Sequence, residues 1–212
     1  MLSTPNLSSC IMPQTKPYQP LIFRLLHGVN AILIIFAAIT GFLVYDSWDG
    51  RFGGLGITRA NRELIDYHGT FGFLIFFVAL PLFLIYCIKA GRSRLIQGDT
   101  LKNWQQIGKP IWWLGLQRIT NTLMLISALF AAISGKFMDE NWLPLGDLTQ
   151  IPYYIHLLAW LTLVITLALH ILMSAKVGGS LLLLSMFDLK YRPQDSPKYW
   201  KDKLVSLFRK NN

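Results

Sequence analysis

Apolar residues along this chain gather into four long blocks instead of alternating with polar residues at helical spacing. The blocks are Leu21–Tyr45, Tyr67–Lys89, Ile111–Ser134 and Pro152–Ala175. Each is long enough to cross a bilayer, which takes about 20 residues of helix. A helix of a soluble bundle would keep a polar face, and the stretch GFLIFFVALPLFLIYCI, from Gly72 to Ile88, has none. The pattern therefore predicts four transmembrane helices, the second one kinked at Pro81.

These blocks divide the 212-residue chain into three parts. We expect a mobile Pro/Ser-rich tail over residues 1–20, a four-helix domain over residues 21–176 and a basic tail over residues 177–212. The predicted fold class is an all-α membrane protein, a four-transmembrane-helix bundle. The N-terminal tail is not expected to be a secretory signal, and no internal repeat is expected. Cys10 and Cys87, one in the tail and one in a span, argue against a disulfide framework.

Positive charge is concentrated in some loops and sparse in others. Of the 20 Lys and Arg residues, two precede or open the first span, six surround the loop between the second and third spans, and eight follow the fourth. Because loops rich in Lys and Arg stay in the cytoplasm, we expect both termini there, with the protein integral to the plasma membrane or an internal energy-transducing membrane. The net charge of +9 is therefore expected to face membrane lipid or water, and not a nucleic acid.

All four histidines lie within the predicted spans or at their edges. His156 and His170 close the uncharged stretch HLLAWLTLVITLALH, which places them about 40° apart around one helix and about 21 Å apart along it. The predicted directions of the spans put His27 at the depth of His170 and His68 at the depth of His156. One intramembrane histidine could serve helix packing alone, but four at two depths indicate two facing pairs.

Two facing imidazoles are too few ligands for zinc, which takes three or four from the protein, and no acidic residue lies in the predicted spans to complete such a site. A porphyrin supplies four equatorial nitrogens and needs only two axial imidazoles. The pattern therefore predicts two non-covalent, bis-histidine b haems; the chain has no Cys-x-x-Cys-His motif for covalent attachment. The predicted iron ligands are His27, His170, His68 and His156.

Residues near the histidines are candidates for contacts with the haems, with quinone or with the membrane interface. Arg24 and Arg118 are predicted to bind haem propionates or a quinone near the cytoplasmic surface, although snorkelling to the interface accounts for Arg118 equally well. Gly28, Gly69 and Gly72 would let a bulky ring approach the backbone, or serve helix packing. The aromatic residues expected in interfacial belts are Trp112, Trp113, Tyr153 and Tyr154.

Three local features resemble the bacterial cytochrome b561 family, which includes the b-type subunits of nickel–iron hydrogenases and formate dehydrogenases. They are FRLLHG in the first span, HGTFG in the second and the histidines fourteen apart in the fourth, and the likeness covers about residues 20–176. It implies two b haems, electron exchange with quinone, and the pairing of His27 with His170 and of His68 with His156. Three segments depart from the simplest members: the long loop DSWDGRFGGLGITRANRELI, the second cytoplasmic loop and the tail from KVGGSLLLLSMFDLKYRP onward. They are candidate docking surfaces for a soluble redox partner subunit.

Three functions remain open from the sequence. The first is a di-haem cytochrome that transfers electrons across the bilayer, to or from quinone, as an oxidoreductase or a subunit of one. The second is a haem-bearing membrane anchor of a dehydrogenase or other redox complex. The third, a haem-free transporter with a histidine proton relay, would need acidic residues or broken helices at mid-membrane, and apart from Pro81 the sequence shows neither.

Overall fold

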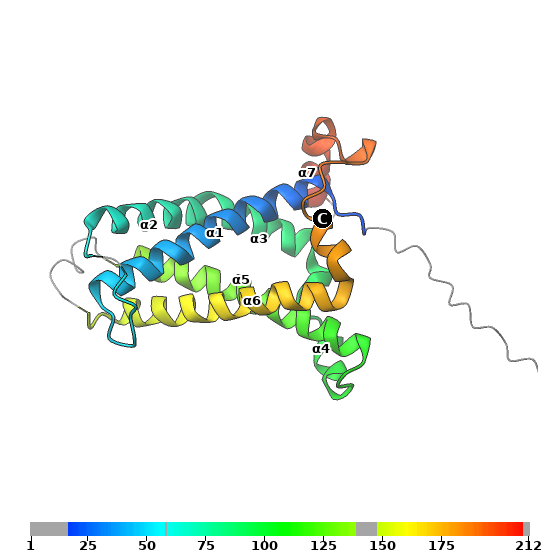
Figure 1. Cartoon of the computed structure of the whole chain (residues 1–212). Helices are drawn as coiled ribbons and strands as arrows, with labels where there is room; N and C mark the ends of the chain where they lie inside the picture. The colour runs from blue at the N-terminus through cyan, green and yellow to red at the C-terminus, as the bar shows by residue number, and fades with distance from the viewer. Residues whose placement is uncertain (1–16, 58, 139–147, 210–212) are drawn as a thin grey trace, which may run out of the picture.

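Four long helical rods form the molecule, a computed structural model that describes residues 17–57, 59–138 and 148–209. The rods are α1 (Leu21–Trp48), a composite of α2 (Arg62–Leu74), a π-helical turn (Ile75–Ala79) and α3 (Leu80–Lys89), then α5 (Pro110–Lys136) and α6 (Ile151–Ser185). They run side by side as a bundle (Figure 1). Each is long and apolar enough to cross a membrane, which confirms the predicted four-helix membrane fold. The expected mobile tail lies mostly outside the described residues.

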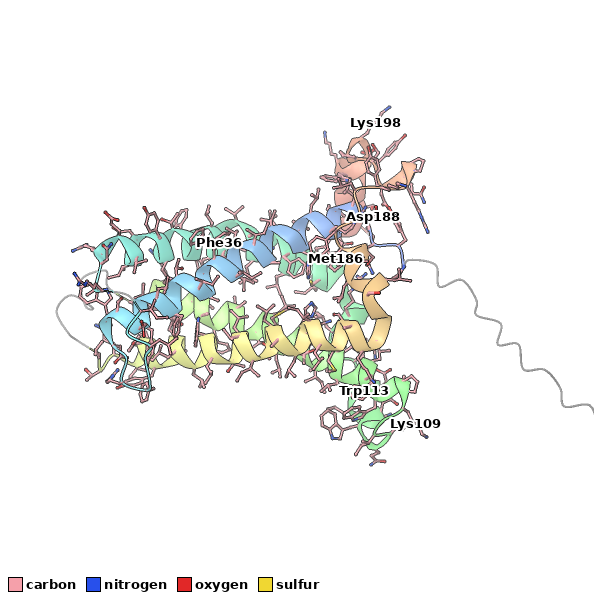
Figure 2. All side chains as sticks on the ribbon, in the orientation of Figure 1. Phe36, Lys109, Trp113, Met186, Asp188 and Lys198 are labelled. Carbon is pink, nitrogen blue, oxygen red and sulfur yellow. The ribbon has the colours of Figure 1, made fainter. Side chains whose placement is uncertain are left out.

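The outside of the bundle is apolar, as a surface facing lipid must be. Phe36, near the middle of α1 (Figure 2), and Phe77 are each about half exposed. Some of the buried positions are instead small and polar: Thr120 and Thr166 are almost fully buried and donate to carbonyls of their own helices. Because lipid is as apolar as leucine, burial of apolar side chains gives little drive for helices to associate in a membrane, and close packing at small residues contributes more.

The second rod changes its winding at the predicted kink. Leu80 N–H bonds to the carbonyl of Ile75, five residues back, so a π-helical turn precedes Pro81. Proline has no N–H to continue the regular ladder, and a widened turn absorbs the missing bond. Asn30 of α1 docks against this turn and donates to the carbonyl of Ala79 at 3.0 Å. The proline therefore fixes where α1 packs on the second rod.

Both described ends of the chain lie at one end of the bundle, together with α4 (Gly98–Lys102) and α7 (Trp200–Arg209) (Figure 1). Lys109 and Lys198 mark this tail end in Figure 2. The α1–α2 connection lies at the opposite end, the loop end, as do the last residues of α5 and the first residues of α6 (Figure 1). The basic segments thus share one end of the bundle, as the expected topology requires, while the compartment that each end faces stays a prediction.

The fourth helix continues past the predicted limit at Ala175. It extends to Ser185 and turns at Gly179, whose φ of 65° is left-handed, a conformation that costs glycine little and other residues more. The last turns of α6 therefore leave the bundle axis at the tail end (Figure 1).

The long α1–α2 loop is held against the loop end of the bundle. The carboxylate of Asp46 accepts hydrogen bonds from three successive backbone amides, those of Leu55, Gly56 and Ile57. Tyr153, expected in an interfacial belt, is only 5% exposed and donates to Asp49 at 2.5 Å. The hydroxyl of Tyr153 thus ties the start of α6 to the end of α1, and its place in an interfacial belt stays a prediction.

Candidate functional site

The four histidine side chains meet in two pairs. The rings of His27 and His170 have centroids 6.0 Å apart and are tilted by 35°. Those of His68 and His156 lie 5.8 Å apart at 84°. We call these the tail-end pair and the loop-end pair. The structure thus brings together the partners predicted from depth, and all four side chains are half-buried, so each keeps part of its ring accessible.

An apolar layer separates the two pairs. Leu163 lies seven residues from both His156 and His170 on α6, and it is buried in a cluster with Ile75, Leu80 and Ala128. Fourteen residues of helix separate the two histidine levels by about 21 Å. The pairs are therefore two distinct sites with an apolar layer between them.

The tail-end pair is positioned by an amide and by aromatic rings. His170 Nδ1 lies 2.7 Å from Asn121 Oδ1, and Asn121 Nδ2 donates to the carbonyl of Arg94 at 2.9 Å. Because the amide nitrogen faces a carbonyl, its oxygen must face His170, and His170 Nδ1 must be the donor. Nε2 of His170 then carries the free lone pair. The ring of His27 packs against Phe23 and Phe83, with centroids 5.8 and 6.1 Å away.

The loop-end pair has the same protonation pattern. His156 Nδ1 donates to the carbonyl of Ala131 at 2.9 Å. His68 Nδ1 lies 3.2 Å from Thr40 Oγ1, and the Thr40 hydroxyl gives its own proton to the carbonyl of Phe36 at 2.8 Å. The hydroxyl oxygen can then only accept from His68. A hydrogen bond at one imidazole nitrogen orients the ring and leaves the other nitrogen to bind a metal.

Glycines allow the helices to approach the loop-end rings. A Cβ on Gly41 would lie 2.9 Å from His68 Cε1, and one on Gly135 would lie 3.2 Å from His156 Cε1. A Cβ on Gly28, Gly69 or Gly72 would instead meet open space. The glycines chosen from the sequence thus border open space, and the two that accommodate the loop-end rings were missed.

A cavity of about 950 Å³ opens beside the loop-end pair, and its lining includes His68, His156, Gly69, Gly72 and Trp160. Ligand pockets in proteins have volumes of about 300–1,000 Å³. A metal ion held between the two rings of a pair, at about 2 Å from each imidazole, would be compatible with the centroid distances of 6.0 and 5.8 Å. Across the described residues, no three or more His, Cys, Asp or Glu side chains gather to hold a metal ion. A metal that brings its own equatorial ligands, as haem does, fits this donor set.

Cationic side chains lie near the tail-end pair. Arg24, one turn before His27, is 5% exposed and donates to the carbonyl of Lys190 at 2.8 Å. Arg94, which the sequence did not single out, lies 4.3 Å over the ring of Phe23. Arg118 lies on α5, and its side chain reaches the segment that follows α3: it donates to the carbonyl of Ser93 at 3.0 Å and forms an ion pair with Asp99 at 3.2 Å.

Comparison with known proteins identifies the family. No curated protein and no solved structure matched the chain. The family model described as prokaryotic cytochrome b561 matches residues 18–188, a range that contains all four long helices and all four histidines. Membership of that family implies haem b, in agreement with the donor set of the two pairs. The chain therefore belongs to the prokaryotic cytochrome b561 family and is an integral, multi-pass b-type cytochrome of electron transfer.

Proposed function

We propose that the protein binds two b haems, one at each histidine pair, and conducts electrons across the membrane to or from quinone. The observation that carries the proposal is the presence of two facing pairs at different depths, with ring centroids 6.0 and 5.8 Å apart. When bound, haem b supplies reversible one-electron chemistry between the ferric and ferrous states.

The surrounding residues have defined tasks in this proposal. The rings of His27, His170, His68 and His156 would hold the two haem irons, and the Nδ1 hydrogen bonds of the last three leave Nε2 free for this role. Asn121, Thr40 and the carbonyl of Ala131 hold the opposite ring nitrogens. The apolar layer around Leu163 excludes water between the two levels. Arg24 and Arg94 supply positive charge beside the tail-end pair, where propionates need it.

Basic segments at the tail end support a cytoplasmic location for this end. Arg24, Arg118 and Trp113 are our candidates for a quinone site there. Lys176 Nζ lies 5.2 Å over the ring of Trp113, so cations and an aromatic face meet at the expected lipid interface.

Haem content and its dependence on each histidine test the proposal. A pyridine haemochrome assay of the purified protein should give two haems per chain, both low-spin. His27→Ala and His170→Ala should each remove the same spectral component, while His68→Ala and His156→Ala should remove the other. One haem per chain, or His27 grouping with His156, would refute the arrangement.

The alternative role as a haem-bearing anchor of a larger redox complex also has structural support. Leu101 and Ile107, in and after α4 at the tail end, are 68% and 74% exposed, which suits a partner subunit as well as lipid. Co-purification in mild detergent distinguishes the two roles, since an anchor would carry a stoichiometric soluble redox subunit and an independent carrier would not.

A further inference from the structure

One hexapeptide occurs twice in this chain. FAAITG covers residues 36–41 of α1, and FAAISG covers residues 130–135 of α5. The expectation of no internal repeat is therefore wrong. Each copy lies on the helix that precedes, along the chain, the helix carrying a loop-end histidine: α1 before His68 on α2, and α5 before His156 on α6.

Both copies contact their histidine through equivalent atoms. Thr40 Oγ1 and Ser134 Oγ each lie 3.2 Å from Nδ1 of the histidine that they face. Each hydroxyl donates to the carbonyl four residues back, at 2.8 Å in α1 and 2.6 Å in α5. The carbonyl of the first alanine of each copy also accepts a hydrogen bond from the same ring, that of Ala37 from His68 and that of Ala131 from His156.

The last residue of each copy sets the distance between helix and ring. An alanine Cβ at Gly41 or Gly135 would approach the histidine Cε1 to 2.9 or 3.2 Å, closer than ordinary van der Waals contact at 3.4–4 Å. Each hexapeptide thus provides a carbonyl, a hydroxyl that can only accept, and a gap for the ring. The tail-end pair is built differently, since its His170 is held by the side-chain amide of Asn121.

We propose that the two hexapeptides are equivalent sockets that hold His68 and His156 with Nδ1 protonated, which makes the loop-end site pseudo-symmetric. Thr40 and Ser134 are its positioning residues. This inference rests on the proposed haem ligation, because a hydrogen-bonded Nδ1 leaves Nε2 of each ring free for the haem that the two histidines would share. Such hydrogen bonds raise the basicity of an imidazole ligand, and their loss typically costs about 10- to 100-fold in metal affinity.

Thr40→Val and Ser134→Ala in the full-length protein test the proposal. Each should weaken retention of the loop-end haem, measured by transfer to an excess of apomyoglobin, by about tenfold. Each should also raise the reduction potential of that haem in a redox titration, because a less basic ligand stabilises the ferric state less. The tail-end haem should keep its potential and its retention.

Matched variants separate positioning from a general structural effect. Thr120, 2% exposed on α5, makes the same intrahelical bonds, to the carbonyls of Leu116 and Gln117. Thr120→Val should therefore leave both potentials unchanged. Thr40→Ser and Ser134→Thr, which exchange the two sockets' own residues, should preserve the wild-type potentials and haem content.

Two results would overturn the socket proposal and leave the proposed haem ligation intact. One is an unchanged potential and retention of the loop-end haem in both Thr40→Val and Ser134→Ala. The other is a change in only one of these two variants. If the exchange variants lose the loop-end haem, the equivalence of the sockets is also refuted. Retention of that haem by His68→Ala would overturn the proposed ligation, and the socket proposal with it.

Discussion

Replacing Gly41 by alanine puts a methyl group where the ring of His68 already lies. The added Cβ would be 2.9 Å from His68 Cε1, whereas ordinary contact begins at 3.4 Å, so the ring or α1 must move by at least the difference, about 0.5 Å. Ligands of a functional site must be held within about 0.5 Å of their productive geometry. The ring has little freedom to move, because Thr40 holds Nδ1 and His156 faces the other side.

The effects on the fold and on the site should differ in size. Alanine in a helix is about 1 kcal/mol more favourable than glycine, and overpacking a close contact costs about 1–3 kcal/mol. The first contribution partly offsets the second, so the helical fold should persist with a net cost of about 0–2 kcal/mol. Haem at the loop-end pair should nevertheless be lost or its spectrum displaced, while haem at the tail-end pair remains.

Haem quantification, a redox titration and the thermal unfolding midpoint of the purified variant measure these effects. Gly135→Ala should act in the same direction but more weakly, because its Cβ would stop at 3.2 Å from His156 Cε1. Gly115→Ala is the control, since its Cβ would lie 3.7 Å from its nearest neighbours, in Thr100. Two haems with wild-type potentials in Gly41→Ala would refute the reasoning, as would equal damage from Gly115→Ala.

Two further predictions concern the tail-end histidine pair, and a third concerns the proposed quinone site. The double variant His27→Ala/His170→Ala should lose little more haem than either single variant, because two ligands of one site act as a unit. Additive losses in haem assays would contradict this pairing. Asn121→Leu should raise the reduction potential of the tail-end haem only. The control Thr122→Val removes a neighbouring hydroxyl that accepts from Ile96 N–H, and it should leave that potential unchanged. Equal shifts in the two variants would show a general effect of the loop. Arg118→Leu should slow quinol-dependent haem reduction in stopped-flow measurements, with haem content retained. The ion pair of Arg118 with Asp99 is partly exposed, so its loss should lower the free energy of unfolding by no more than about 1 kcal/mol. An unchanged reduction rate would remove Arg118 from the quinone site.

The sequence alone was sufficient for the four spans, the pairing of the histidines and the family resemblance. Hydropathy predicts each span separately, because each transmembrane segment must satisfy its backbone hydrogen bonds within itself and face lipid on its own. Helix geometry then converts sequence spacing into depth, so His156 and His170 had to lie at different levels. The assignment of each histidine to its partner needed only the direction of each span, which the charges of the loops indicated.

Only the tertiary structure decided which atoms support each ring. Asn121 and His170 are 49 residues apart, and Thr40 and His68 are 28 apart, so their contacts depend on how each helix is rotated against its neighbour. The same rotation placed Gly41 and Gly135 against the loop-end rings, while Gly28, Gly69 and Gly72 border open space. Helix rotation follows from close packing of many small side chains at once, and hydropathy along one chain carries little information about it.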